Sequence, residues 1–105
     1  MKEEIKFPYK TRKRIVLVGG HDTFVNVMKK RFPNIRFIDA NKWAIDPKII
    51  RHADVVWIQN NCMCHSQFKF VVKTASLYKI PIKYFAAAGT ARSSQQIIED
   101  DIKTG

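Results

Sequence analysis

Short apolar runs alternate along this chain with segments whose apolar residues recur at helical spacing. Runs that are apolar nearly throughout are typical of strands buried on both faces of a parallel sheet. Their alternation with helical segments favours βαβ units, in which each helix crosses over between parallel strands. The sequence therefore predicts strands at 14–18, 35–40, 54–59 and 82–86 and helices at 22–32, 46–52, 66–79 and 94–102.

The expected architecture follows from this order of elements. Because crossover connections are right-handed, we expect the α/β class, with a small open parallel sheet of four strands in the order 2-1-3-4 and helices on both faces. Residues 1–13 are expected to form a basic N-terminal arm, and residues 14–105 a single α/β domain.

Residue types at the expected helix ends indicate how the helices begin. Asp46 precedes Pro47 and suits the N-cap of the second helix. Asp22 or Thr23 can cap the first helix. The segment 87–94 is rich in small residues and is expected to be a loop that leads into the last helix.

The composition is that of a folded, basic domain. Hydrophobic residues make up 46% of the 105 residues, which is enough for a core. The 19 Lys and Arg exceed the nine Asp and Glu by a formal charge of +10, which favours anionic partners, nucleic acid among them. No apolar run approaches the roughly 20 residues of a membrane span, so no membrane partner is expected. The acidic and basic N-terminus does not resemble a signal peptide, and we expect a cytoplasmic location.

The polar residues that follow the expected strands predict where a ligand binds. In open parallel sheets, ligands bind beyond the carboxyl ends of the strands, where the strand order reverses. For the order 2-1-3-4, this crevice lies between the first and third strands, and the loops that leave them are 19–21 and 60–65. The candidate ligand-binding residues are Gly19, Gly20, His21, Asn60, Asn61, His65, Thr90 and Ser93.

The glycines suggest the kind of ligand. Gly19 and Gly20 lie between a strand and a helix, where backbone N–H groups can approach a phosphate. A tight turn alone also explains two glycines. We therefore expect a small-ligand-binding module for a nucleotide or another anion, with nucleic-acid binding by the basic arm as an alternative.

A cluster of metal-binding residue types supports a second alternative, a metal or haem site. His21, Cys62, Cys64 and His65 are the candidate ligands, because thiolates and imidazoles bind transition metals and haem iron. The C-x-C-H spacing lacks the second pair of a structural zinc site and differs from the C-x-x-C of thioredoxins. A catalytic Cys with a His base would need an orienting third group, which the sequence does not identify. Without paired carboxylates, the sequence argues against an enzyme, although hydrolysis of a bound nucleotide stays open.

Most of the chain between Arg14 and Ile98 resembles the DUF-2325 family of bacterial domains of unknown function. The resemblance lies in a strand that ends in G-G-H, a helix that ends near F-P-N, an A-D-hydrophobic strand, a C-H pair before a helix, and I-P-I before the last strand. It implies a small Rossmann-like domain and no particular reaction. The matching residues are Gly19, Gly20, His21, Asp54, His65 and Pro81.

Assembly is predicted from the edges of the sheet. A small open sheet leaves two edge strands, which dimer formation often covers, so a homodimer is expected. Trp57 lies within an apolar strand and is expected in the core, whereas Trp43 is expected in a loop.

Overall fold

The computed structural model describes residues 7–38, 46–59, 65–85 and 89–104. Strands and helices alternate along the chain, as the sequence predicted. The elements are β1 (Ile15–Gly19), α1 (Asp22–Arg31), β2 (Arg36–Ile38), α2 (Pro47–Arg51), β3 (Val55–Gln59), α3 (His65–Leu77), β4 (Ile82–Tyr84) and α4 (Thr90–Thr104).

The four strands form one parallel sheet with the order β2-β1-β3-β4, which confirms the predicted topology. The register places Val16 of β1 beside Arg36 of β2, and Leu17 beside Trp57 of β3. Each of the two edge strands has only three residues. The central pair, β1 and β3, therefore forms the frame to which the edge strands are added.

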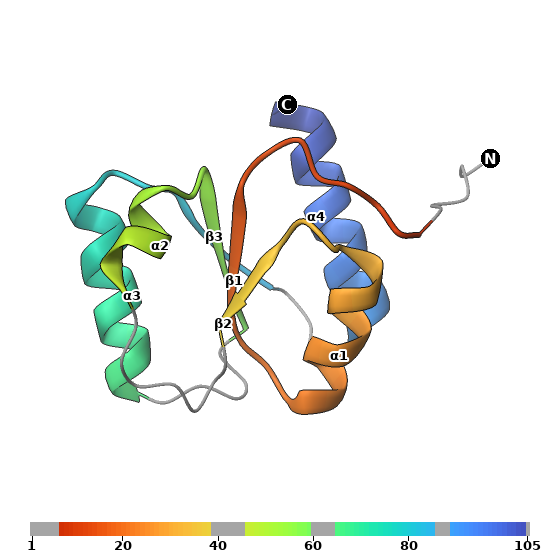
Figure 1. The fold of residues 1–105 in the computed structure, drawn as a ribbon, viewed down its shortest axis with the longest axis horizontal. Coiled ribbons are helices and arrows are strands. Elements are labelled where there is room, and N and C mark those ends of the chain that lie inside the picture. The colour runs from red at the N-terminus through yellow and green to blue at the C-terminus, as the bar shows by residue number, and fades with distance from the viewer. Residues whose placement is uncertain (1–6, 39–45, 60–64, 86–88, 105) are drawn as a thin grey trace.

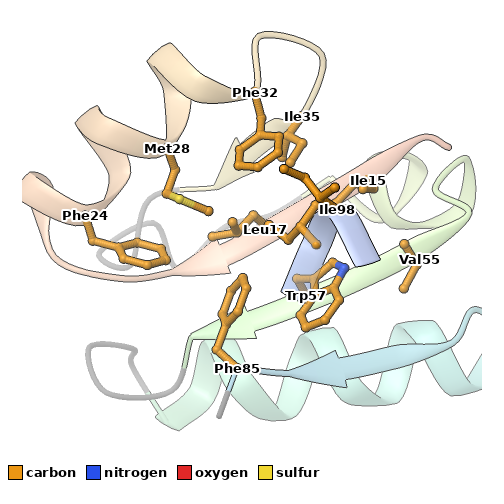
Figure 2. Packing of buried hydrophobic residues seen from close by; sticks show 11 residues of the cluster. Ile15, Leu17, Phe24, Met28, Phe32, Ile35, Val55, Trp57, Phe85 and Ile98 are labelled. Atoms are coloured by element: carbon orange, nitrogen blue, oxygen red, sulfur yellow. The ribbon is translucent and has the colours of Figure 1, made fainter. Parts of the chain in front are cut away.

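The helices cover both faces of this sheet (Figure 1). The pair α1 and α4 lies on one face, and the pair α2 and α3 on the other. Alternate residues of the central strands point to opposite faces, as the pleat requires. Ile15, Leu17 and Trp57 pack against α1 and α4, where Trp57 is 4% exposed and stacks on Phe85 (Figure 2).

The other face has a separate aliphatic cluster. Val16, Val56 and Ile58 pack there with Ile50 of α2 and Val71 of α3. These side chains are almost completely buried. The continuous apolar runs of β1 and β3 are thus explained, because both faces of each strand are covered.

Two of the predicted helix starts differ from the structure. Residue 94 was expected to begin the last helix, but α4 begins at Thr90, so much of the predicted small-residue loop is helical. Neither Asp22 nor Thr23 caps α1, because the N-cap residue is His21, and it makes no side-chain capping bond. The predicted cap of α2 is confirmed, since the Asp46 side chain accepts a hydrogen bond from the Lys48 N–H at 2.9 Å.

The described part of the predicted arm, residues 7–13, lies against the domain. The carboxylate of Asp101 on α4 is fully buried and accepts hydrogen bonds from the backbone N–H groups of Arg12 at 3.0 Å and Lys13 at 3.2 Å. It also accepts one from the Tyr9 hydroxyl at 2.9 Å. A single buried carboxylate therefore fixes the course of the chain just before β1.

Candidate functional site

The carboxyl ends of β1 and β3 lie side by side. The last residue of β1, Gly19, is directly opposite the last residue of β3, Gln59. The turn that follows β1 and the segment that follows β3 therefore start from adjacent points. This is the position at which the strand order reverses, because the chain next adds β2 on one side of β1 and β3 on the other.

The turn after β1 needs glycine for two reasons. Gly19 and Gly20 have φ angles of 90° and 97°, in a region that L-residues rarely adopt. At Gly20, an added Cβ would lie 2.7 Å from Cδ1 of Phe24, a buried ring of the core. The close approach of the turn to Phe24 thus accounts for Gly20 without any ligand.

His21 leads from this turn into α1. Its backbone is extended, and its carbonyl accepts the first helical hydrogen bond from the Val25 N–H at 2.9 Å. The His21 side chain is exposed, as is the neighbouring Asp22. The first N–H groups of a helix have no partner within it, so this end of α1 offers donors next to an exposed imidazole.

The segment that follows β3 contains most of the remaining predicted ligands. α3 begins at His65, but the His65 side chain lies outside the description. Asn60, Asn61, Cys62 and Cys64 also lie outside the described residues. Their assignment to the site, and the spacing between His21 and His65, stay predictions.

The predicted residues of the last loop belong to α4. Thr90 is its first residue and is half-buried. Ser93 is fully buried, and its N–H donates to the Gly89 carbonyl at 3.1 Å, so its hydroxyl does not face solvent. Ser94 is also buried and donates to the Thr90 carbonyl at 2.7 Å. The small side chains therefore serve the packing of α4, and Thr90 is the more accessible of the two predicted ligands, Thr90 and Ser93.

The described side chains do not include a ready metal site. No group of three or more His, Cys, Asp or Glu residues that could hold a metal ion occurs within residues 7–38, 46–59, 65–85 and 89–104. Since both cysteines lie outside these ranges, the metal or haem hypothesis stays a prediction. A visible absorption spectrum and elemental analysis of the purified protein test it.

A second feature, at the opposite ends of the strands, was not predicted. A cavity of about 600 Å³ opens beside the amino ends of β1 and β2. We call it the basic cavity. Its lining residues are Thr11, Arg12, Lys13, Arg14, Ile15, Val16, Asn34, Arg36, Lys48, Ile49, His52 and Ala53. The sequence signals for it were the basic run before β1, which we expected to form an arm, and His52, the histidine after α2.

Comparisons with protein-family models, curated proteins and solved structures found no match to this chain. The resemblance to the DUF-2325 family therefore stays a prediction. None of the described helices combines the length and the hydrophobicity that a membrane span requires.

Proposed function

We propose that this domain binds a small anionic ligand, a nucleotide or another phosphate-bearing molecule, beyond the carboxyl ends of β1 and β3. The observation that carries the proposal is the pairing of Gly19 with Gln59 at the point where the strand order reverses. In open parallel sheets this is the position at which ligands bind. The basic net charge of +10 favours the capture of such a ligand.

The groups that would contact the ligand differ in their roles. The first N–H groups of α1 follow the turn at Gly19 and Gly20, and a phosphate is proposed to bind them there. The exposed His21 would donate a hydrogen bond to the ligand. Asn60, Asn61 and His65 are proposed to orient it from the β3 side.

Asp22 makes the proposal unusually easy to test. Its exposed carboxylate lies in the first turn of α1, where it competes with any anion for the same helix end. Removing this charge should improve the binding of an anionic ligand. Most substitutions beside a binding site weaken binding, so a gain of affinity is a specific signal.

The experiment is an NMR titration with nucleoside mono-, di- and triphosphates. The backbone amide resonances of Gly20 and His21 should shift saturably. Asp22→Asn should tighten binding by about two- to fivefold, since removing one charge a few ångströms away is worth about 1 kcal/mol or less in a solvated site. His21→Ala should weaken binding.

Two control variants separate local from general effects. Glu99→Gln makes the same charge change at an exposed position of α4, and Asn26→Ala truncates an exposed side chain of α1. Neither should alter the affinity. Resonances of Gly20 and His21 that do not move at millimolar nucleotide, or equal gains from Asp22→Asn and Glu99→Gln, would contradict the proposal.

A further inference from the structure

The described ionisable side chains that line the basic cavity are all basic. Five Lys and Arg residues line it together with His52, and none of the Asp and Glu residues within 7–38, 46–59, 65–85 and 89–104 does so. They come from three separate parts of the chain, namely the segment before β1, the start of β2, and α2. Folding thus gathers cations that are far apart in the sequence, at a cost in mutual repulsion.

Four of these cations are not paired with a described carboxylate. No described carboxylate forms an ion pair with Arg12, Arg14, Arg36 or Lys48. All four side chains are exposed at the rim. An anion that enters the cavity would therefore meet guanidinium and ammonium groups that have no competing carboxylate partner among the described residues.

The nearby carboxylates bind the backbone of these basic residues instead. Asp54 accepts a hydrogen bond from the Arg14 N–H at 2.8 Å, and Asp46 accepts one from the Lys48 N–H at 2.9 Å. The buried Asp101 carboxylate holds the N–H of Arg12. The main chain is thereby fixed while the basic side chains stay available, which reduces the entropy lost on binding.

The floor of the basic cavity is apolar. Ile15, Val16 and Ala53 line it and are each 5% exposed or less. Ile49 adds a half-buried aliphatic side chain from α2. A cavity of about 600 Å³ lies within the usual range for small-molecule sites, which combine an apolar lining with a few polar groups that fix orientation.

We propose that the basic cavity is a second binding site, at the amino ends of the strands, for the phosphate groups of a nucleotide-sized ligand. The apolar floor would contact the uncharged part of the ligand, and the rim cations would bind its phosphates. Guanidinium groups suit this role because their planar donors match phosphate oxygens in pairs. This site is independent of the one proposed beyond the carboxyl ends of β1 and β3, since the two share no residue.

The same chemistry can come from a free nucleotide or from a nucleic-acid strand. The first should saturate at one ligand per basic cavity. The second should bind in proportion to the number of phosphates contacted, with an affinity that falls steeply as salt rises. A nucleoside triphosphate and a single-stranded oligonucleotide are therefore both used as probes, each at two salt concentrations, with the uncharged nucleoside as the negative control.

The test uses the full chain and two matched double variants. Arg36→Gln/Lys48→Gln removes two rim cations at exposed positions, and Lys69→Gln/Lys73→Gln removes two exposed cations from α3. The net charge changes equally in both. Binding is followed by calorimetry and by the amide resonances of Ala53 and Arg36, which lie at the cavity, beside those of Gly20 and His21.

Binding of the triphosphate should shift the Ala53 and Arg36 resonances, and the rim variant should bind at least about tenfold more weakly, as expected for lost charge-assisted hydrogen bonds. The α3 variant should bind within about twofold of the wild type. If the oligonucleotide binds and the rim variant weakens its binding to the same extent, the phosphates that the cavity binds are those of a nucleic-acid strand. No shift at Ala53 and Arg36 with either probe, or equal weakening in both variants, would overturn the proposal. Shifts confined to Gly20 and His21 would overturn the proposal for the basic cavity and would support the site beyond the carboxyl ends of β1 and β3.

Discussion

Gly20 illustrates how one residue can be fixed by packing rather than by a ligand. Its φ of 97° is unfavourable for any L side chain, and an added Cβ would lie 2.7 Å from the Phe24 ring. Phe24 is buried against Phe85, with ring centroids 5.8 Å apart, so it cannot move without disturbing the core. The glycine is therefore required by the fold whether or not the turn binds an anion.

Gly20→Ser should lower the free energy of unfolding by about 2 kcal/mol or more, because it combines backbone strain with a steric overlap. Gly89→Ser is the matched control. Gly89 has open space where a Cβ would lie, and it precedes α4, where serine is a favourable N-cap residue. Urea unfolding followed by circular dichroism measures both. Equal stabilities of the two variants would show that the turn tolerates a side chain.

Tyr9 is the residue whose ionisation is most clearly coupled to folding. Burial, the hydrogen bond to Asp101 and the charge of that carboxylate raise the pKa of Tyr9 above its ordinary value near 10. The folded state thus holds this proton more tightly than the unfolded chain does. The resulting stabilisation is complete below about pH 10 and is lost as the pH rises through the raised pKa.

The stability of the wild type should therefore fall with pH above about 10 more steeply than that of Tyr9→Phe. Urea titrations at a series of alkaline pH values measure the two slopes. Tyr84→Phe, at an exposed position of β4, controls for the removal of one phenol. Parallel curves for the wild type and Tyr9→Phe would mean that the Tyr9 proton does not contribute to stability.

At the scale of elements, the sheet was predictable and the start of α4 was not. Val55 to Gln59 and Ile15 to Gly19 are strands because nearly every side chain is apolar, and the handedness of crossovers then sets the strand order. The small-residue segment 87–94 resembled a loop because Gly, Ser and Thr have weak helix preferences, although Ala91 and Arg92 favour a helix. In the folded chain, Ser94 donates to the Thr90 carbonyl and contacts Sδ of Met28 on α1, so packing decides the helical state.

The docking of residues 7–13 shows a different limit of sequence reasoning. The bond from the Arg12 N–H to Asp101 joins residues 89 positions apart, and no local pattern reports such a contact. One signal was present: Asp101 lies four positions after Ile97, on the buried face of α4. An acid on the apolar face of a helix indicates a buried partner. This signal predicts that the last residues of the expected arm, 11–13, pack against the domain, where they line the basic cavity.

The whole molecule presents two candidate binding regions, at the opposite ends of its parallel strands. The region at the carboxyl ends was predictable, because it follows from strand order alone. The region at the amino ends was not, because its cavity requires three segments to meet.

The expected homodimer stays a prediction. Exposed apolar side chains at Leu77, Tyr84 and Ile102 offer contacts for it, and sedimentation velocity measures it directly.

The net charge of +10 on a chain with a radius of gyration of 13.1 Å makes a further prediction about the whole molecule. The Debye length near 0.1 M salt is about 10 Å, comparable with this radius, so salt in this range screens repulsion across the molecule. Because compaction brings like charges together, the folded state gains more from screening than the unfolded chain. The Tm should therefore rise by several degrees, about 3–6 °C, between very low ionic strength and 0.1 M sodium chloride.

Screening and site binding respond differently to the choice of anion. Screening depends on ionic strength, so sodium chloride and inorganic triphosphate at equal ionic strength should raise the Tm equally if repulsion alone is relieved. Binding in the basic cavity adds an increment for triphosphate, which grows with the logarithm of its concentration above the Kd. Scanning calorimetry of the wild type and Arg36→Gln/Lys48→Gln separates the two, since the variant should keep most of the response to chloride and lose the part of the increment that comes from the basic cavity. A Tm that falls on adding chloride would show that favourable charge pairs outweigh the repulsion inferred from the net charge.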